Sequence, residues 1–187
     1  MKVLIVIDMQ NDFITGSLAN PAAEAIVKPI VSYINNYDGD FILATRDTHH
    51  DSYLNTYEGE HLPIKHCVYG TDGWQVNWDI MSALKSWKEK NASKNAALIN
   101  KPYFGYAEDI SIRIFDKLDE MGKDECVDEI EFVGTVTEIC VISNVLGLKP
   151  YFPDADFIVH SDMCAGLTKE AHEAALTVMR SCQVKVV

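Results

Sequence analysis

The stretch Val3-Leu4-Ile5-Val6-Ile7-Asp8 decides the fold. An apolar, mostly β-branched run that ends on a carboxylate is typical of a strand buried on both faces of a parallel sheet. Similar short runs recur along the chain and predict further strands at 41–45, 97–99, 130–133, 157–159 and 184–187. We therefore expect a sheet of about six strands.

Helical patterns separate these strands. Apolar residues recur at three- and four-residue spacing in the intervening segments, which predicts helices at 22–37, 74–90, 109–121, 138–148 and 169–181. Gly39 and Gly122 follow two of these helices, and Thr168 is a natural N-cap for the last one. Strands alternating with helices predict an α/β fold: one domain spanning 1–187, with three layers (α/β/α) and a mostly parallel, Rossmann-like sheet.

Composition narrows the class of function. The chain has 187 residues, of which 48% are hydrophobic and 24% charged, a balance typical of one globular domain. A net charge of -12 without any Lys/Arg cluster argues against nucleic-acid binding. The first apolar run is too short for a signal peptide or a membrane span, so we expect a cytoplasmic protein without a membrane partner. Five cysteines without CxxC spacing predict free thiols.

One segment breaks the alternation of strands and helices. Residues 47–73 show little periodicity, and a long excursion of this kind in a compact domain is usually functional. In open parallel sheets, ligands bind beyond the carboxyl ends of the strands, where the strand order reverses. We therefore expect functional residues in this loop and directly after each strand.

Cys140 is the strongest candidate for a nucleophile. It follows a strand and a Gly-Thr-Val-Thr turn, so we expect it in the first turn of a helix, where the macrodipole favours the thiolate. Asp8 and Lys101 follow two other predicted strands. Burial raises the pKa of a carboxyl group and a neighbouring ammonium lowers it, so this pair could be tuned to take the thiol proton.

The loop at 47–73 carries a candidate metal site. Asp47 and His49 alternate along an extended segment, and His66 with Glu58 or His61 could complete the set of ligands. Imidazole and carboxylate ligands suit Zn, Fe or Mn. The residues alone leave both the metal and the choice between Glu58 and His61 open.

Five motifs carry a family resemblance: VIDMQNDF (6–13), TRDTHH (45–50), EGEHLPIKHCVYGTDGW (58–74), KPYFG (101–105) and GTVTEICV (134–141). In this order they resemble the isochorismatase-like cysteine hydrolases, and within them the nicotinamidase/pyrazinamidase group, over residues 3–180. The resemblance implies the isochorismatase-like hydrolase fold. It also implies hydrolysis of a linear amide: nicotinamide to nicotinate and ammonia in NAD salvage, with pyrazinamide also accepted.

The resemblance also assigns roles to residues. It implies a catalytic triad of Asp8, Lys101 and Cys140 that forms a thioester. It implies a cis peptide between Thr135 and Val136, and an oxyanion hole made by the backbone N–H groups of Val136 and Cys140, which would stabilise the transition state of acyl transfer.

One divalent metal ion is implied as well, with Asp47, His49 and His66 as ligands. Glu58 aligns best with an acidic fourth ligand, and zinc is expected ahead of Fe or Mn. In the family this metal binds the ring nitrogen of the substrate and orients the ring. Relatives commonly self-associate, so a homo-oligomer is expected.

Phe13, Leu62, Tyr103 and Phe104 are the expected substrate contacts. Many relatives have an aromatic residue where this chain has Pro63, so the aliphatic wall at Leu62 and Pro63 leaves the substrate open. The alternative is a cysteine amidohydrolase of the same superfamily that acts on another small amide or ureido compound. A catalytically idle interaction protein is a third hypothesis, against which the intact triad argues.

Overall fold

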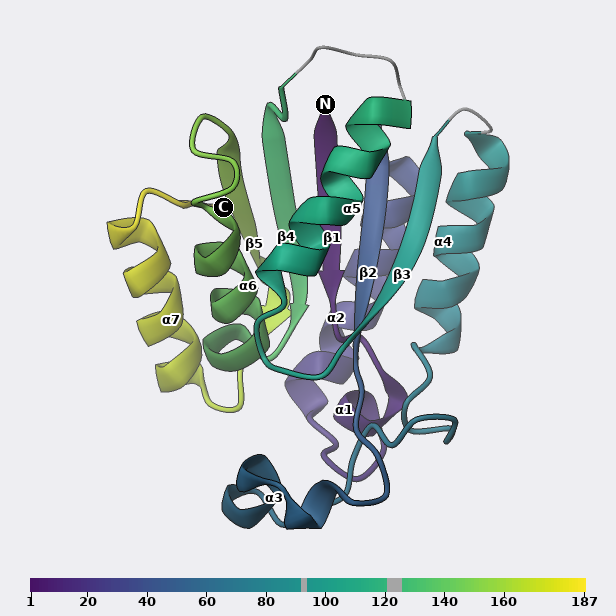
Figure 1. Cartoon of the computed structure of the whole chain (residues 1–187), viewed down its shortest axis with the longest axis vertical. Helices are drawn as coiled ribbons and strands as arrows, with labels where there is room; N and C mark the ends of the chain where they lie inside the picture. The colour runs from purple at the N-terminus through teal and green to yellow at the C-terminus, as the bar shows by residue number, and fades with distance from the viewer. Residues whose placement is uncertain (92–93, 121–125) are drawn as a thin grey trace.

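The computed structural model describes residues 1–91, 94–120 and 126–187. Its centre is a six-stranded sheet in the order β3-β2-β1-β4-β5-β6 (Figure 1). Every neighbouring pair in the sheet is parallel. The strands are β1 (Lys2–Ile7), β2 (Phe41–Asp47), β3 (Asn95–Lys101), β4 (Glu129–Thr135), β5 (Asp156–Ala165) and β6 (Lys185–Val186). The predicted α/β class and strand number are confirmed.

Helices cover both faces of the sheet and make the three predicted layers (Figure 1). One face carries α5 (Ala107–Glu120), α6 (Ile142–Leu148) and α7 (Lys169–Ser181), and the other carries α2 (Pro21–Asn36) and α4 (Trp78–Lys90). Two short helices, α1 (Asn11–Ile14) and α3 (Tyr57–His61), lie beyond the carboxyl ends of the strands.

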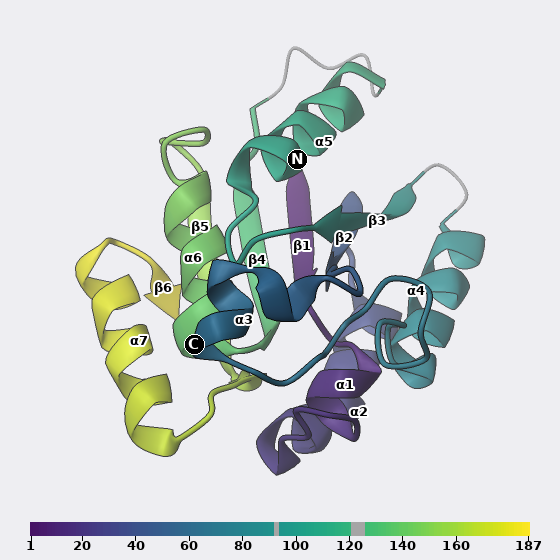
Figure 2. The same ribbon diagram turned by 60° about the horizontal axis from the view of Figure 1, so that its bottom comes forward.

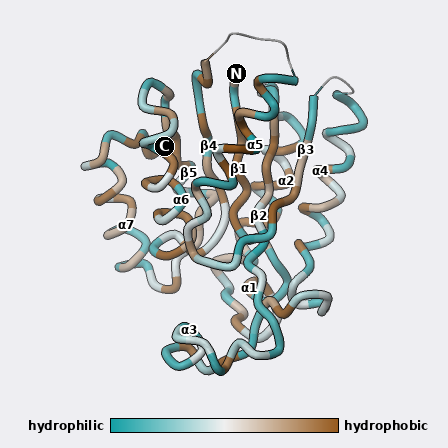
Figure 3. The backbone as a smooth tube through the Cα atoms, in the orientation of Figure 1, coloured by the Kyte–Doolittle hydropathy of each residue, from teal (hydrophilic) through white to brown (hydrophobic). Residues whose placement is uncertain are grey.

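The two hydrophobic cores follow from the two-residue period of the strands. Val3, Ile5 and Ile7 face the α5–α6–α7 layer, and Leu4 and Val6 face the α2–α4 layer, all at 0% exposure. Because both faces of β1 are buried, its sequence is a continuous apolar run. Figure 3 accordingly shows hydrophobic (brown) stretches along the strands at the centre of the sheet.

Several element boundaries differ from the sequence-based expectations. β5 runs to Ala165, beyond the predicted 157–159, because its second half continues to pair with β4 after a register shift. The predicted helix 74–90 begins only at Trp78, where the Asn77 side chain accepts a hydrogen bond from the backbone N–H of Asp79. The segment 138–148 is a π-helical turn (Thr137–Val141) followed by α6. Gly122 lies outside the described residues.

The strand order reverses at β1, which lies between β2 and β4. The carboxyl ends of the strands point toward α1 and α3, and Figure 2 shows α3 in front of this edge of the sheet. Strand order in this fold makes that edge the expected place for a ligand. Within the described residues, no helix is both long and apolar enough to span a bilayer.

Candidate active site

Asp8 lies at the carboxyl end of β1 and is fully buried. Its φ of 47° is left-handed, which is unfavourable for a residue with a side chain. Thr45 of β2 holds this conformation: its hydroxyl donates to Asp8 Oδ1 at 2.7 Å and accepts from the Asp8 backbone N–H at 3.2 Å. Residues of two neighbouring strands therefore set the direction of the carboxylate.

Lys101 ends β3 and is also fully buried. Its Nζ lies 2.7 Å from Asp8 Oδ2, 3.6 Å from Asp47 Oδ1 and 3.5 Å from Cys140 Sγ, and it donates to the backbone oxygen of Tyr103 at 3.1 Å. Burial alone would lower the pKa of Lys101, but the charges of Asp8 and Asp47 raise it above its ordinary value. The ammonium therefore stays charged.

Cys140 lies in the π-helical turn after β4, and only 5% of its surface is exposed. Burial raises the pKa of its thiol well above the ordinary value, and the charge of Asp8 adds to that rise, while Lys101 lowers it. The helix start that carries Cys140 favours the thiolate, as expected, but burial and the charge of Asp8 oppose this effect. The thiol is neutral because it is desolvated beside a carboxylate, so attack requires transfer of its proton.

The turn before Cys140 contains a cis peptide between Thr135 and Val136, at the position that the family resemblance implies. Both of these residues and Cys140 line the same pocket. The candidate nucleophile and the candidate oxyanion-hole residues thus face one cavity.

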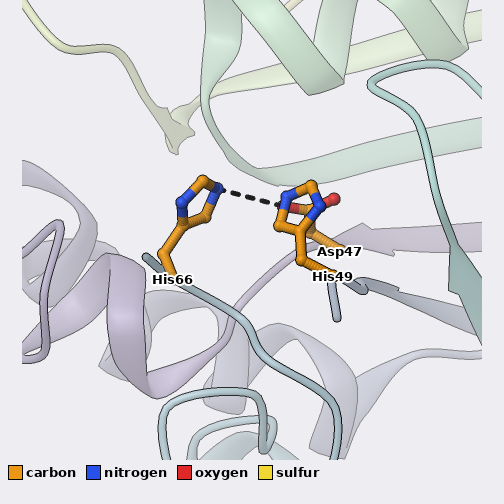
Figure 4. Close-up of side chains that lie close together, drawn as sticks. All are labelled: Asp47, His49 and His66. Carbon is orange, nitrogen blue, oxygen red and sulfur yellow. Dashed lines mark ion pairs between the residues drawn. The ribbon is translucent and has the colours of Figure 1, made fainter. Parts of the chain in front are cut away.

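Asp47, His49 and His66 form a compact cluster of buried side chains whose oxygen and nitrogen atoms could bind a metal ion (Figure 4). Asp47 Oδ2 lies 2.9 Å from His49 Nε2 and 3.4 Å from His66 Nε2. Asp47 Oδ1 and His49 Nε2 are buried without a hydrogen-bond partner in the described part of the chain. Two imidazole nitrogens and a carboxylate that converge in this way fit a divalent cation such as Zn, Fe or Mn.

Glu58 faces this cluster and His61 does not. Glu58 Oε1 lies 3.5 Å from His49 Nε2 and 4.0 Å from His66 Nε2, and it too is buried without a hydrogen-bond partner among the described residues. The His61 ring is exposed and turns back to the Tyr57 carbonyl, 2.8 Å from its Nδ1. Geometry therefore favours Glu58 as the fourth donor.

The Asp47 carboxyl group stays ionised although it is buried. Burial alone would raise its pKa, but the imidazoles of His49 and His66 beside Oδ2, together with the charge of Lys101, hold the pKa well below its ordinary value. Gln10 fixes the backbone here: its side-chain amide donates to the Asp47 carbonyl at 2.9 Å and accepts from the Asp47 N–H at 2.7 Å.

A pocket of about 390 Å³ lies between Cys140 and the candidate metal ligands Asp47, Glu58 and His66. Phe13, Leu62 and Phe104, three of the expected substrate contacts, line it. Tyr103 is not among the lining residues, and its side chain is 67% exposed. The Tyr103 carbonyl accepts the hydrogen bond from Lys101, and a substrate contact of its side chain stays a prediction. The remaining lining residues are Ser17, Leu18, Ala19, Asn20, Asp47, Glu58, His66, Thr135, Val136, Ile139, Cys140 and Leu167.

Sequence reasoning missed the residues that position the site. Asn144 of α6 is fully buried and donates from its side-chain amide to the carbonyls of Cys140 and Phe104, at 2.7 and 2.9 Å. Gln10 and Thr45 act in the same way on Asp47 and Asp8. Gln10 and Thr45 lie within the quoted motifs, which were the available signal. Their burial, however, depends on strands far away in sequence.

Comparisons with known proteins show the family and the fold of the chain. The family model described as the Isochorismatase domain matches residues 2–187. The nicotinamidase/pyrazinamidase of Mycobacterium tuberculosis is 30% identical over 209 residues, with 100% of this chain and 98% of the relative covered. A crystal structure of a pyrazinamidase/nicotinamidase from Streptococcus mutans aligns with a TM-score of 0.80 at 25% identity, covering 100% of both chains. A pyrazinamidase of Pyrococcus horikoshii in complex with zinc aligns at 0.75 and 26% identity, covering 100% of this chain and 98% of that one.

The fold and the site define a hydrolase of the α/β class, with a cysteine beside a buried Asp–Lys pair. The chain belongs to the isochorismatase family. Within it, the chain falls in the nicotinamidase/pyrazinamidase group, whose members are amidohydrolases.

Proposed function

We propose that this protein is a metal-containing nicotinamidase, which hydrolyses nicotinamide to nicotinate and ammonia and also accepts pyrazinamide. One observation carries the proposal: Cys140 Sγ lies 3.5 Å from Lys101 Nζ, Asp8 lies 2.7 Å from the same Nζ, and Cys140 shares its pocket with the donors Asp47, Glu58 and His66. The nucleophile and the ring-orienting donors thus open onto one cavity, and the proton acceptor Asp8 is buried behind the nucleophile, next to Lys101.

In the first half of the reaction, Asp8 takes the proton of the Cys140 thiol, and the sulfur attacks the carbonyl carbon of the amide. The backbone N–H groups of Val136 and Cys140 donate to the oxyanion. Lys101 balances the charge that moves between Asp8 and Cys140. When the C–N bond breaks, the leaving nitrogen takes the proton from Asp8, which leaves ammonia and a thioester.

Water completes the cycle. Asp8, ionised again, takes a proton from water as the oxygen attacks the thioester carbonyl. The C–S bond breaks, the sulfur regains the proton from Asp8, and the carboxylic acid product ionises on release. The products are nicotinate and ammonia, and nicotinate would serve NAD salvage.

Asp47, His49, His66 and Glu58 would hold the divalent metal. When bound, the metal supplies a Lewis-acid contact that binds the pyridine nitrogen and so orients the ring. The donor types suit Zn, Fe and Mn alike, and the zinc complex of the Pyrococcus horikoshii pyrazinamidase supports zinc as the first candidate. Phe13, Leu62 and Phe104 would pack against the ring.

The test is ammonia release from nicotinamide by the purified protein. Cys140→Ala and Asp8→Asn variants are assayed beside it, metal content is determined on each preparation, and light scattering reports self-association. Turnover that is lost in both variants while metal remains bound supports the proposal. A folded, metal-loaded protein without turnover would contradict it.

A second candidate is hydrolysis of another small amide or ureido compound by the same chemistry. Its support is the aliphatic part of the pocket wall, made by Leu18, Leu62 and Leu167. A panel of nicotinamide, pyrazinamide, an aliphatic amide and an N-carbamoyl compound separates the two. A higher kcat/KM for a compound without a ring nitrogen would favour the second candidate.

A further inference from the structure

The connection between β5 and α7 borders the candidate active site. It lies at the foot of α7, on the same side of the molecule as α1 and α3 (Figure 1). Leu167 in this connection lines the pocket, although 61% of its surface is exposed. A side chain that is both exposed and lining lies at the mouth of the cavity, where it can cover a bound ligand.

Two side chains from elsewhere in the chain hold the backbone of this connection. Glu138 Oε1 accepts a hydrogen bond from the Leu167 N–H at 2.8 Å, and Asn20 donates to the Gly166 carbonyl at 2.9 Å. On the far side, Thr168 caps α7 by accepting from the Ala171 N–H at 3.1 Å. The backbone on both sides of the Leu167 side chain is therefore fixed before a ligand enters.

Gly166 leaves room for the Glu138 carboxylate beside the backbone of this connection. A Cβ at Gly166 would lie 2.7 Å from Glu138 Oε2, closer than side-chain contacts tolerate. Oε2 itself is buried and has no hydrogen-bond partner among the described residues. Glu138 does not line the pocket, so the contact that accounts for its position is the one to the Leu167 backbone.

We propose that Leu167 is a specificity-determining contact for the apolar ring of the substrate, and that Glu138 is the positioning residue that holds it at the mouth of the pocket. The inference rests on the proposed function, because the ligand it describes is a planar aromatic carboxamide. A side chain whose backbone is already ordered loses less conformational entropy on contact with a ligand, so more of the contact appears as affinity.

The experiment compares Glu138→Ala, Glu138→Gln, Leu167→Ala and the Glu138→Ala/Leu167→Ala double variant. Loss of the aliphatic contact of Leu167 should raise KM for nicotinamide roughly 5- to 10-fold. We expect that rise in Glu138→Ala and Leu167→Ala, with kcat changed less than about 2-fold. The double variant should match Leu167→Ala, since both changes remove one contact. Glu138→Gln keeps an acceptor oxygen and should restore KM.

Glu173→Ala is the matched control, because it removes an exposed carboxylate from α7 without touching the loop. Hydrogen exchange provides a readout that needs no turnover: the Leu167 amide should exchange faster in Glu138→Ala but not in Glu138→Gln or Glu173→Ala. Nicotinate binding measured by calorimetry should weaken by the same factor as KM.

Three results would overturn the inference. A fall in kcat at constant KM in Glu138→Ala would show that the residue acts through the Cys140 turn. Additive effects in the double variant would show that Glu138 and Leu167 act independently. An unchanged exchange rate of the Leu167 amide would show that Glu138 does not hold this backbone. Absent turnover with nicotinamide, alongside normal nicotinate binding that weakens in Glu138→Ala, would instead refute the proposed function and leave the positioning role intact.

Discussion

Replacing Asn144 with alanine tests how the nucleophile is held. Its amide group donates to the carbonyls of Cys140 and Phe104, at 2.7 and 2.9 Å, and accepts from the Tyr106 N–H at 2.9 Å. These bonds tie the Cys140 turn to the loop that carries the Phe104 wall of the pocket. Asn144 is fully buried, so water cannot replace the lost partners.

The expected loss of stability follows from those three bonds. At about 1 kcal/mol for each neutral hydrogen bond, Asn144→Ala should lower the free energy of unfolding by about 3 kcal/mol. With an m-value of about 2 kcal/mol/M, the urea midpoint should fall by about 1.5 M. Displacing the sulfur by a fraction of an ångström should also lower kcat for nicotinamide by about 10- to 100-fold.

Urea unfolding and steady-state ammonia release are measured on the same preparations. Asn144→Asp keeps the acceptor for Tyr106 but sets a carboxylate against two carbonyls, so it should be at least as destabilised as Asn144→Ala. Ser143→Ala is the control, because the Ser143 hydroxyl makes no hydrogen bond in the described ranges; it should stay within about 0.5 kcal/mol of the parent. A loss below about 1 kcal/mol in Asn144→Ala, with full kcat, would refute the reasoning.

Further predictions concern the metal and pH. Glu58→Gln should weaken metal binding by about 10-fold in equilibrium dialysis, whereas His61→Ala should leave it unchanged; equal effects would contradict the Glu58 assignment. Removing the metal with a chelator should raise KM for nicotinamide, and added zinc should restore it. Burial alone would raise the pKa of Glu131, but hydrogen bonds from His160 and Tyr33 lower it below its ordinary 4.5. The ionised Glu131 carboxylate therefore stabilises the fold above its ordinary pKa, and this stabilisation is lost as the pH falls through the lowered pKa of the folded protein. Between neutral pH and about pH 3, the Tm of Glu131→Gln should therefore fall less than the Tm of the parent protein.

The sequence predicted the architecture well because the pattern there is local. A continuous apolar run such as 3–7 is compatible with few environments other than a strand buried on both faces, and strand–helix alternation then restricts the topology. β5 was predicted too short, because its continuation beyond 159 contains polar residues whose strand pairing depends on β4.

The candidate site was predicted as a list of residue types at strand ends. Asp8, Lys101 and Cys140 do meet, since the carboxyl ends of parallel strands share one edge of the sheet. The protonation state of Cys140 could not be predicted in this way. A helix terminus favours the thiolate, but the burial that opposes it comes from residues distant in sequence.

By itself, the sequence determined the α/β class, the motifs of the family and the chemical types of the donors. Only the tertiary structure decided that Glu58 rather than His61 faces the two imidazole nitrogens, and that Phe104 rather than Tyr103 lines the pocket. In each pair the residues are close in sequence, and spacing cannot separate them. What separates them is which side chain enters the desolvated space between strands, helices and loops, and that depends on packing across the whole chain.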